Sequence, residues 1–308
     1  MKRSARAIVI LAAAAALAGM QATPGFLAHS DTPKSDLVEK LQNAQAEIDW
    51  GEGYYYATGE GIVPSSQDEP NRMRAYLKAK GYARMKAIAE LRMAIEATPV
   101  NHKTSGKECL ARDEGVRLIV EGYVAHVETV GEKQRVEGAN TIVSVTVRCP
   151  IYGQNGVGSA IVRCRGVRDA SGDASVDRRG DVKAPSVPPG SKGPFTSLVV
   201  DCGGLSVQRA ISPKIRKPDG REMWGTVPAD ADALQDRGIV AYARGIEEAK
   251  RNPRTGANPL VVKAIGRAGG RFMCDAAVSE PDAERIVQEN QSSHFLDKFD
   301  VVFAVDGM

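Results

Sequence analysis

The sequence predicts an α+β protein of two small domains, the first a long helix packed on an antiparallel sheet. Residues 68–99 carry the end signals and apolar spacing of one long helix, and residues 141–149 alternate apolar and polar side chains as a half-buried strand does. Residues 166–193 contain no Leu, Ile, Met or aromatic residue. This gap separates a domain at residues 35–165 from a second domain at residues 194–308.

The first domain is expected to open with a short helix and a tyrosine-rich strand. One side of the helix predicted over residues 36–48 carries Leu37, Leu41, Ala44 and Ile48. The run GYYYATGEGIV at residues 53–63 follows and favours a strand. Its glycines indicate close backbone approach or a bulge, because neither a Lys-Ser/Thr pair nor G-x-G-x-x-G spacing marks a phosphate loop.

The long helix has a signal at each end. Asp68 is placed to cap it, Glu69 and Pro70 suit its first turn, and Thr98-Pro99 ends it. Its predicted apolar stripe, widened by alanines, consists of Leu77, Gly81, Met85, Ile88, Leu91 and Ile95. Basic residues occupy the rest of its surface, a pattern that favours a solvated amphipathic helix over a nucleic-acid surface.

Two or three antiparallel strands are expected after this helix. The clearest is residues 141–149, in which Val143, Val145 and Val147 share one face. Residues 116–127 and 160–167 show similar but less regular patterns. A strand, a long helix and further strands together predict a compact layer with the helix across one face of the sheet.

Residues 166–193 are predicted to be a flexible linker, because they cannot bury enough apolar surface to offset their ordering entropy. Part of this segment has the alternate spacing of calcium ligands, at Asp169, Ser171, Asp173 and Asp177. An EF-hand would need Gly and Glu where Ala174 and Gly180 stand, so a solvated linker is favoured over a calcium site.

The second domain is also expected to be α+β. It begins with the strand FTSLVVDC at residues 195–202, and the sequence KPDGR at residues 217–221 predicts a turn. Residues 260–265 and 301–306 are predicted to be short buried strands. A helix begins after Ser279, which is followed three residues later by an acid in the pattern of a capping box, and runs to about Ser292.

Residues 1–22 are predicted to be an export signal. Lys2, Arg3 and Arg6 precede an apolar stretch that is too short to span a bilayer. The sequence Leu-Ala-Gly is followed by Met20, where a lipid-modified protein would have cysteine, so no direct lipid anchor is expected. We expect a periplasmic protein, peripheral to the outer membrane if it is held there, and retained by protein contacts.

The charge of the chain gives no support for nucleic-acid binding. The whole sequence has 41 basic and 38 acidic residues. The predicted signal contains three bases and no acid, so the remainder has 38 of each sign. A balanced charge leaves self-association unopposed.

The five cysteines are expected to meet an oxidising compartment, where two disulfides and one free thiol can form. The first candidate pair is Cys202 and Cys274, the second is Cys149 and Cys164, and Cys109 is left over. Because no spacing is C-x-x-C, neither a zinc knuckle nor a thioredoxin-type site is predicted.

No catalytic motif is found, and neither a cofactor nor a metal is predicted. The sequence contains no G-x-S-x-G, no H-E-x-x-H, and no S-x-x-K with plausible partners. The four histidines are interpreted as satisfied or solvent-facing residues, at His29, His102, His126 and His294. A site assembled from distant residues would leave no such motif.

Residues 50–165 resemble a known family. The segments YATGEG, AYLKAKGYARMKAIAELRMAI, RLIVEGYVAHVETV and TIVSVTVRCPIYG are similar to the small bacterial outer-membrane lipoprotein family that includes flagellar lipoprotein P and the amino-terminal domain of flagellar assembly protein T. The second half, with VDCGGL, DGRE and NPLVVKA, looks like uncharacterised bacterial envelope proteins. The resemblance implies a structural or assembly role in the envelope, around a flagellar motor. Met20 departs from the lipoprotein pattern.

These observations favour a non-catalytic periplasmic protein that binds other envelope proteins or copies of itself. Its predicted interface is the apolar stripe of Leu37, Leu41 and Ile48, which lies ahead of the first domain. Packing of this stripe onto that domain is the alternative. The second functional hypothesis is a periplasmic ligand-binding protein or enzyme that uses a cleft between the domains.

Overall fold

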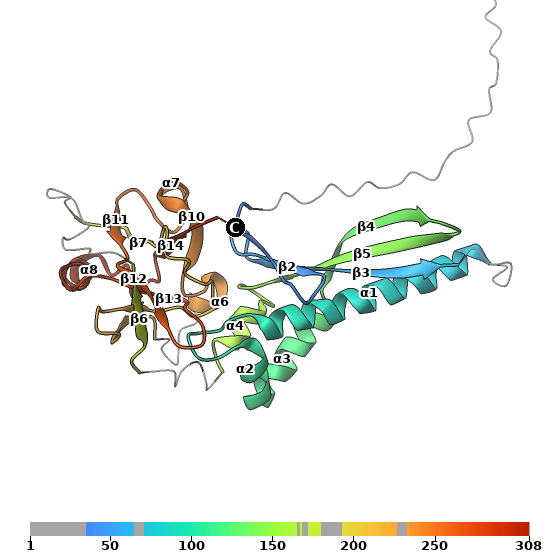
Figure 1. Ribbon diagram of the computed structural model, residues 1–308, viewed down its shortest axis with the longest axis horizontal. Helices are drawn as coiled ribbons and strands as arrows, with labels where there is room; N and C mark the ends of the chain where they lie inside the picture. The colour runs from blue at the N-terminus through green and yellow to red at the C-terminus, as the bar shows by residue number, and fades with distance from the viewer. Residues whose placement is uncertain are drawn as a thin grey trace, which may run out of the picture.

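The computed structural model describes residues 35–64, 71–164, 167, 172–179, 193–226 and 233–307 (Figure 1). It confirms the α+β class. Two units lie side by side along the long axis of the molecule. We call residues 35–164 the first unit and residues 172–307 the second unit.

The first unit is an antiparallel sheet with a long helix on one face. The strands, in spatial order, are β1 (Val38–Lys40), β2 (Ala46–Asp49), β3 (Tyr54–Val63), β5 (Asn140–Pro150) and β4 (Glu128–Glu137). Helix α1 (Arg72–Ala97) runs along the sheet and packs mainly on β3 and β5 (Figure 1). The predicted strand at residues 141–149 is confirmed as the centre of β5, with Val143, Val145 and Val147 fully buried.

Small residues set the contact between α1 and β3. The buried positions of α1 recur every four residues and are alanines along most of its length, at Ala75, Ala79, Ala83 and Ala87. Opposite them, a Cβ on Gly61 would collide with the Ala79 carbonyl oxygen, and a Cβ on Gly59 would collide with that of Ala83. The glycines of β3 therefore allow close backbone approach, as predicted.

The predicted apolar stripe of α1 is wrong in part. Leu91 and Ile95 are buried, but Leu77 and Met85 are 58% and 64% exposed. The glycine-lined β3 leaves room for alanines alone, and a leucine there would hold the helix away from the strand. Asn71 caps the helix by accepting a hydrogen bond from the Arg74 amide at 3.0 Å. The predicted cap Asp68 lies outside the described residues, as do Glu69 and Pro70.

The predicted helix at residues 36–48 is wrong. This segment forms β1 and β2, a hairpin added to the edge of β3. Leu37 and Ile48 are 0% and 1% exposed and belong to the main core, and Leu41 is half-buried against it. The proposed interface of Leu37, Leu41 and Ile48 is therefore wrong, because two of these side chains belong to the core and the third packs against it.

Two of the expected strands are wrong, because helices lie there instead. Residues 116–127 lie almost wholly in α3 (Glu114–Ala125), which comes after α2 (Gly106–Arg112). Residues 160–167 include the end of α4 (Val157–Ile161) and a turn. Asp113 explains the start of α3, because its carboxylate accepts a hydrogen bond from the Val116 amide at 3.1 Å as an N-cap.

The second unit holds two sheets. Four parallel strands lie in the order β10 (Ala241–Arg244), β14 (Val301–Val305), β7 (Ser197–Asp201) and β11 (Pro259–Lys263). The second sheet has the order β6 (Ser175–Arg178), β12 (Gly266–Gly269), β13 (Asp275–Ala277), β8 (Ile215–Arg216) and β9 (Glu222–Trp224). The remaining helices are α6 (Ala233–Arg237), α7 (Gly245–Ala249) and α8 (Glu280–Ser293).

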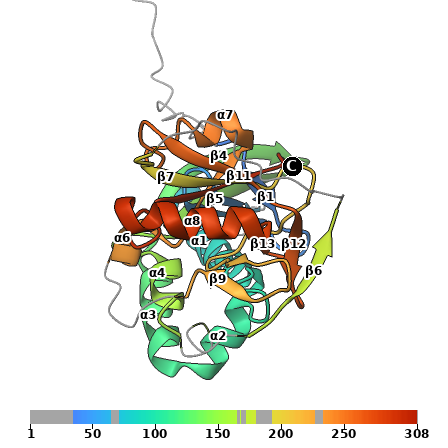
Figure 2. The same cartoon turned by 90° about the vertical axis from the view of Figure 1, so that its left-hand side faces the viewer.

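Most sequence predictions for this unit are confirmed. The strands expected at residues 195–202, 260–265 and 301–306 are β7, β11 and β14. Helix α8 begins at the predicted cap, where Ser279 accepts from the Asp282 amide at 3.2 Å, and it lies across the outer end of the unit (Figure 2). The predicted turn closes through a hydrogen bond from the Gly220 amide to the Lys217 carbonyl at 3.0 Å.

The predicted linker is not a linker throughout. Within it, β6 pairs antiparallel with β12. Asp177 of β6 accepts a hydrogen bond from Arg267 at 3.0 Å, so this carboxylate serves an ion pair in the sheet. Asp169 and Ser171, the first two residues of the calcium-like spacing, lie outside the described residues.

The two units share one continuous core. Backbone hydrogen bonds join them, from the Ile211 amide to the Pro99 carbonyl at 3.1 Å and from the Ser212 amide to the Val100 carbonyl at 2.7 Å. The indole of Trp50 meets the ring of Tyr242 edge to face, with 5.4 Å between centroids. Sites at this junction are therefore built by residues of both units.

Candidate functional site

A buried charge cluster lies at the junction of the units. His102, from the first unit, and Arg216 and Asp275, from β8 and β13, are all essentially inaccessible to solvent. Arg216 Nε donates to Asp275 Oδ2 at 2.6 Å, and its Nη2 lies 3.2 Å from His102 Nδ1. Arg216 Nη1 also donates to the carbonyls of Gly172 and Gly220, at 2.8 and 2.9 Å. Because its charged groups are so fully bonded, we interpret the cluster as a structural link.

Burial sets the protonation of His102. Burial first, and then the neighbouring charges of Arg216, Lys103 and Lys214, lower the pKa of this histidine from 6.5 to about 4, against a smaller opposing effect of Glu222. Burial also raises the pKa of Asp275, although Arg216 opposes this. At neutral pH His102 is therefore uncharged, so its Nδ1 accepts the hydrogen bond from Arg216.

We expect acid to weaken the fold through His102. Between pH 6.5 and pH 4 the unfolded chain binds a proton at this residue and the folded chain does not, so its contribution is complete above pH 6.5 and is lost as the pH falls. The loss amounts to about 3 kcal/mol. Urea unfolding of the wild type and of His102→Asn at several pH values measures it as the difference between the two curves. Parallel curves, or an equal effect of His294→Asn at an exposed site, would contradict the prediction.

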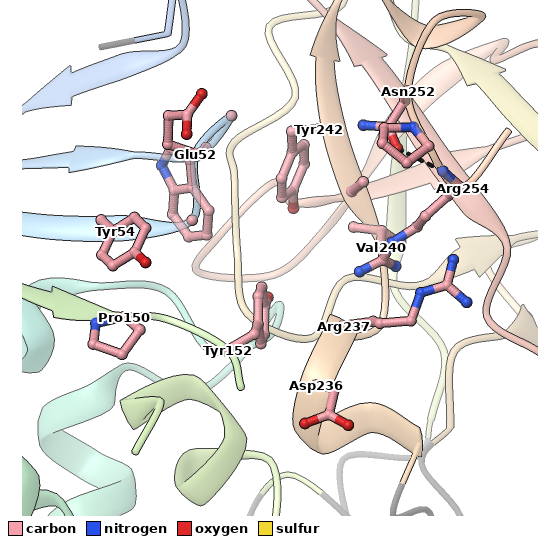
Figure 3. Close-up of a pocket in the computed structure, with 15 residues that line it drawn as sticks. Glu52, Tyr54, Pro150, Tyr152, Asp236, Arg237, Val240, Tyr242, Asn252 and Arg254 are labelled. Carbon is pink, nitrogen blue, oxygen red and sulfur yellow. Dashed lines mark hydrogen bonds between the residues drawn. The ribbon is translucent and has the colours of Figure 1, made fainter. Parts of the chain in front are cut away.

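A cleft of about 350 Å³ opens between the units (Figure 3). Tyr54, Pro150 and Tyr152 of the first unit face Arg237 and Tyr242 of the second across it. The full lining is Trp50, Gly51, Glu52, Gly53, Tyr54, Pro150, Tyr152, Asp236, Arg237, Val240, Ala241, Tyr242, Asn252, Pro253 and Arg254. Aromatic walls with a few charged groups are typical of a recognition surface.

Protein contacts fix most polar side chains of this cleft. Tyr152 donates its hydroxyl proton to the Ile211 carbonyl at 3.1 Å, and Tyr242 donates to the Ala210 carbonyl at 3.0 Å. Arg237 pairs with Asp300 at 2.9 Å. Arg254 donates to two backbone carbonyls, and burial lowers the pKa of its guanidinium to about 10, so it remains a cation at neutral pH. These contacts within the protein hold the walls of the cleft in one shape.

The outward face of α1 is apolar and basic. Its exposed apolar side chains, each 44–65% exposed, are Met73, Leu77, Tyr82, Met85 and Met93. Its exposed charged residues are Arg72, Arg74, Lys78 and Arg92. All of α1 is described, and its two acids, Glu90 and Glu96, are half-buried. Glu90 accepts a hydrogen bond from the Gln45 amide at 2.9 Å. This apolar face, on which no acid of α1 is exposed, is a candidate interaction surface.

Among the described residues, the cysteines and histidines singled out from the sequence line neither the cleft nor the outward face of α1. All five cysteines are buried free thiols, so neither Cys202 with Cys274 nor Cys149 with Cys164 is bonded in this structure. Cys109, predicted to be left over, lies against Cys164, whose thiol donates to the Cys109 carbonyl at 3.6 Å. His126 and His294 are exposed, and His29 lies outside the described residues. In the described part of the chain, no group of three His, Cys, Asp or Glu side chains could hold a metal.

The comparison with protein families concerns the second unit. Residues 197–307 match the family model for the second domain of Treponema pallidum Tp0624. No curated protein matches the chain. The matched segment begins with β7 and ends two residues beyond β14, so it covers the whole parallel sheet and excludes β6. It also excludes residues 50–165, whose resemblance to the flagellar lipoprotein family stays a prediction. None of the described helices is both long and apolar enough to cross a membrane.

Proposed function

We propose that the protein is a non-catalytic component of the bacterial envelope, exported to the periplasm, which works by binding a protein partner through the outward face of α1. The observation that carries this proposal is the set of large apolar side chains exposed along a 26-residue helix. Leaving Met73, Leu77 and Met85 in water costs free energy, and a partner that covers them recovers it. An envelope assembly role, including one at a flagellar motor, fits such a partner.

Charge identifies the kind of partner. Of the seven basic residues of α1, Lys80 and Arg92 form ion pairs with Glu132 and Glu121 of neighbouring elements. The exposed basic residues beside Met73 and Leu77 are Arg72, Arg74 and Lys78, and the two acids of the helix are half-buried. Two copies that met through this face would bring like charges together, which opposes self-association. An acidic surface with an apolar centre complements it, and long-range attraction would speed its association.

Site-specific photocrosslinking in the native envelope tests this proposal. A photoreactive residue at position Met85 is expected to give a discrete adduct, and mass spectrometry should identify an acidic partner in it. The matched control is Ile62, which is 61% exposed on the opposite face of the sheet and should not give that adduct. The double change Leu77→Glu with Arg74→Glu should reduce the adduct at Met85 at least tenfold.

Two outcomes of the crosslinking experiment would contradict the proposal. An adduct between two copies of this chain would replace the acidic partner with self-association. Equal adducts at positions Met85 and Ile62, or none at Met85, would show that the outward face of α1 is not an interface. Thermal unfolding of the Arg74→Glu and Leu77→Glu protein should stay within about 1 kcal/mol of the wild type, because both positions are exposed.

A second candidate function is ligand binding in the cleft. Its volume of about 350 Å³ and its rings at Trp50, Tyr54, Tyr152 and Tyr242 favour this alternative. Native mass spectrometry of protein purified from its own source would detect a retained small molecule. The cleft substitution Tyr54→Ala should then abolish retention while the crosslink at Met85 persists, which separates the two functions.

A further inference from the structure

A second cavity lies at the carboxyl ends of β7 and β14, and its volume is about 300 Å³. Residues 206–209, in the chain that follows β7, form one wall, and Asp306 and Gly307, which follow β14, form another. Glu39 of β1 and Pro99 close the cavity from the first unit. In open parallel sheets, ligands bind outside the carboxyl ends of the strands, which is where this cavity lies.

Backbone amides hold the rim of the cavity in one shape. The Gly203 amide donates to Asp201 Oδ1 at 3.0 Å. The Gly204 amide donates to both carboxylate oxygens of Asp306, each at 3.0 Å. These bonds tie the end of β7 to the end of β14, so the position of the Asp306 carboxylate is fixed at the edge of the cavity.

Arg209 supplies a buried positive charge to the wall. The residue is 6% exposed, and its Nη2 donates to the Asp306 carbonyl at 2.8 Å. Its Nε is buried without a hydrogen-bond partner among the described residues. The protein therefore leaves this buried guanidinium incompletely bonded, and a carboxylate in the cavity that Arg209 lines would stabilise its charge.

Two carboxylates line the same cavity. Glu39 accepts a hydrogen bond from Trp50 Nε1 at 2.8 Å, which orients its side chain. All three charged residues line this one cavity, and the charges of Glu39 and Asp306 oppose the lowering of the Arg209 pKa by burial. A lone anion would meet two negative charges here, and a lone cation would meet the guanidinium. A ligand that carries both charges has a complement for each of them.

We propose that this cavity binds a small zwitterion of amino-acid or dipeptide size, whose carboxylate lies on Arg209 and whose ammonium lies between Glu39 and Asp306. A volume of about 300 Å³ is at the small end of ligand sites and fits such a molecule. The inference uses neither the outward face of α1 nor the cleft of Figure 3. It therefore holds or fails independently of the proposed function.

Isothermal titration calorimetry of the full chain tests the site. The probes are the twenty L-amino acids and the dipeptides Ala-Ala and Gly-Gly, each titrated to 10 mM. At least one is expected to bind with a stoichiometry of one. Its N-acetyl and carboxamide analogues, each of which lacks one charge, should bind at least tenfold more weakly. This comparison uses the unchanged protein, so it does not depend on how a variant folds.

Two substitutions then locate the binding. Glu39→Gln and Arg209→Gln should each raise the Kd of the probe at least tenfold. The control Arg271→Gln, at a 59% exposed side chain, should leave the Kd unchanged. The proposal is overturned if no probe binds, or if the singly charged analogues bind as tightly as the zwitterion. Binding of inorganic phosphate with equal affinity would also overturn it, because that result would define a simple anion site.

Discussion

Replacing Arg216 with Met is expected to lower the free energy of unfolding by about 3–5 kcal/mol, the range measured when one partner of a buried ion pair is removed. Arg216 is fully buried, and its guanidinium bonds Asp275, His102 and the carbonyls of Gly172 and Gly220. Without it, the Asp275 carboxylate stays buried with no cation beside it. Chemical unfolding at neutral pH measures the change.

Two further variants test the reason for this loss. Arg216→Met combined with Asp275→Leu removes both charges and should recover much of the lost stability, because no unpaired carboxylate remains. Arg221→Met breaks the exposed ion pair with Asp219 and should cost far less than the change at Arg216, because water screens this pair. If the single change at Arg216 costs no more than the change at Arg221, the buried cluster does not link the units.

Replacing Gly61 with Val should destabilise the first unit by about 3 kcal/mol or more. A Cβ at this position would collide with the Ala79 carbonyl oxygen, which belongs to the backbone and cannot turn away as a side chain can. The helix α1 must then move away from β3 and lose part of its packing on the sheet. Thermal or urea unfolding of the Gly61→Val protein measures this cost.

The matched control is another glycine, on the outward face of α1. A Cβ at Gly81 meets nothing within 4 Å, and alanine favours a helix more than glycine does. Gly81→Ala is therefore expected to stabilise the protein by about 0.5–1 kcal/mol. Opposite signs for these two changes would support the close contact of α1 with β3. A neutral Gly61→Val would show that the helix packs more loosely than described.

The parts of the fold that depend on local chemistry could be predicted from the sequence. The valines of β5 alternate with polar residues, and this pattern predicts a half-buried strand without knowledge of its neighbours. The cap at Ser279 and the turn at residues 217–221 are fixed by interactions over three or four residues. Each of these features was predicted and is confirmed.

The parts that depend on distant partners could not be predicted. The spacing of Leu37, Leu41 and Ile48 fits a helix, but it also fits two short strands, and the pairing of β2 with β3 decides between them. In α1 the apolar period predicted Leu77 and Met85 as core residues. The glycines of β3 select alanines instead, and helical periodicity does not contain that information.

The candidate sites could not be predicted from local sequence patterns either, because each is built from residues that are distant in the chain. The cleft brings Trp50, Tyr152 and Tyr242 together from segments far apart in the chain, and none of the three belongs to a catalytic or ligand-binding motif. Arg209 gains its importance from its burial and from the cavity that it lines together with Glu39, neither of which the sequence shows. The histidine spacing gave no signal for His102 either, because its partners Arg216 and Asp275 come from the other unit.

The pairing of β6 with β12 has a consequence for solubility. Strand β12 consists of Gly266, Arg267, Ala268 and Gly269, and it pairs with β13 on one side. Without β6 its other edge would offer unpaired amides and carbonyls to any other chain. Strand β6 covers that row and replaces it with a four-residue edge that includes Asp177 and Arg178. Short, charged edges resist the addition of foreign strands. Strand β6, which lies in a segment with the composition of a linker, therefore protects the edge of β12 from pairing with other chains.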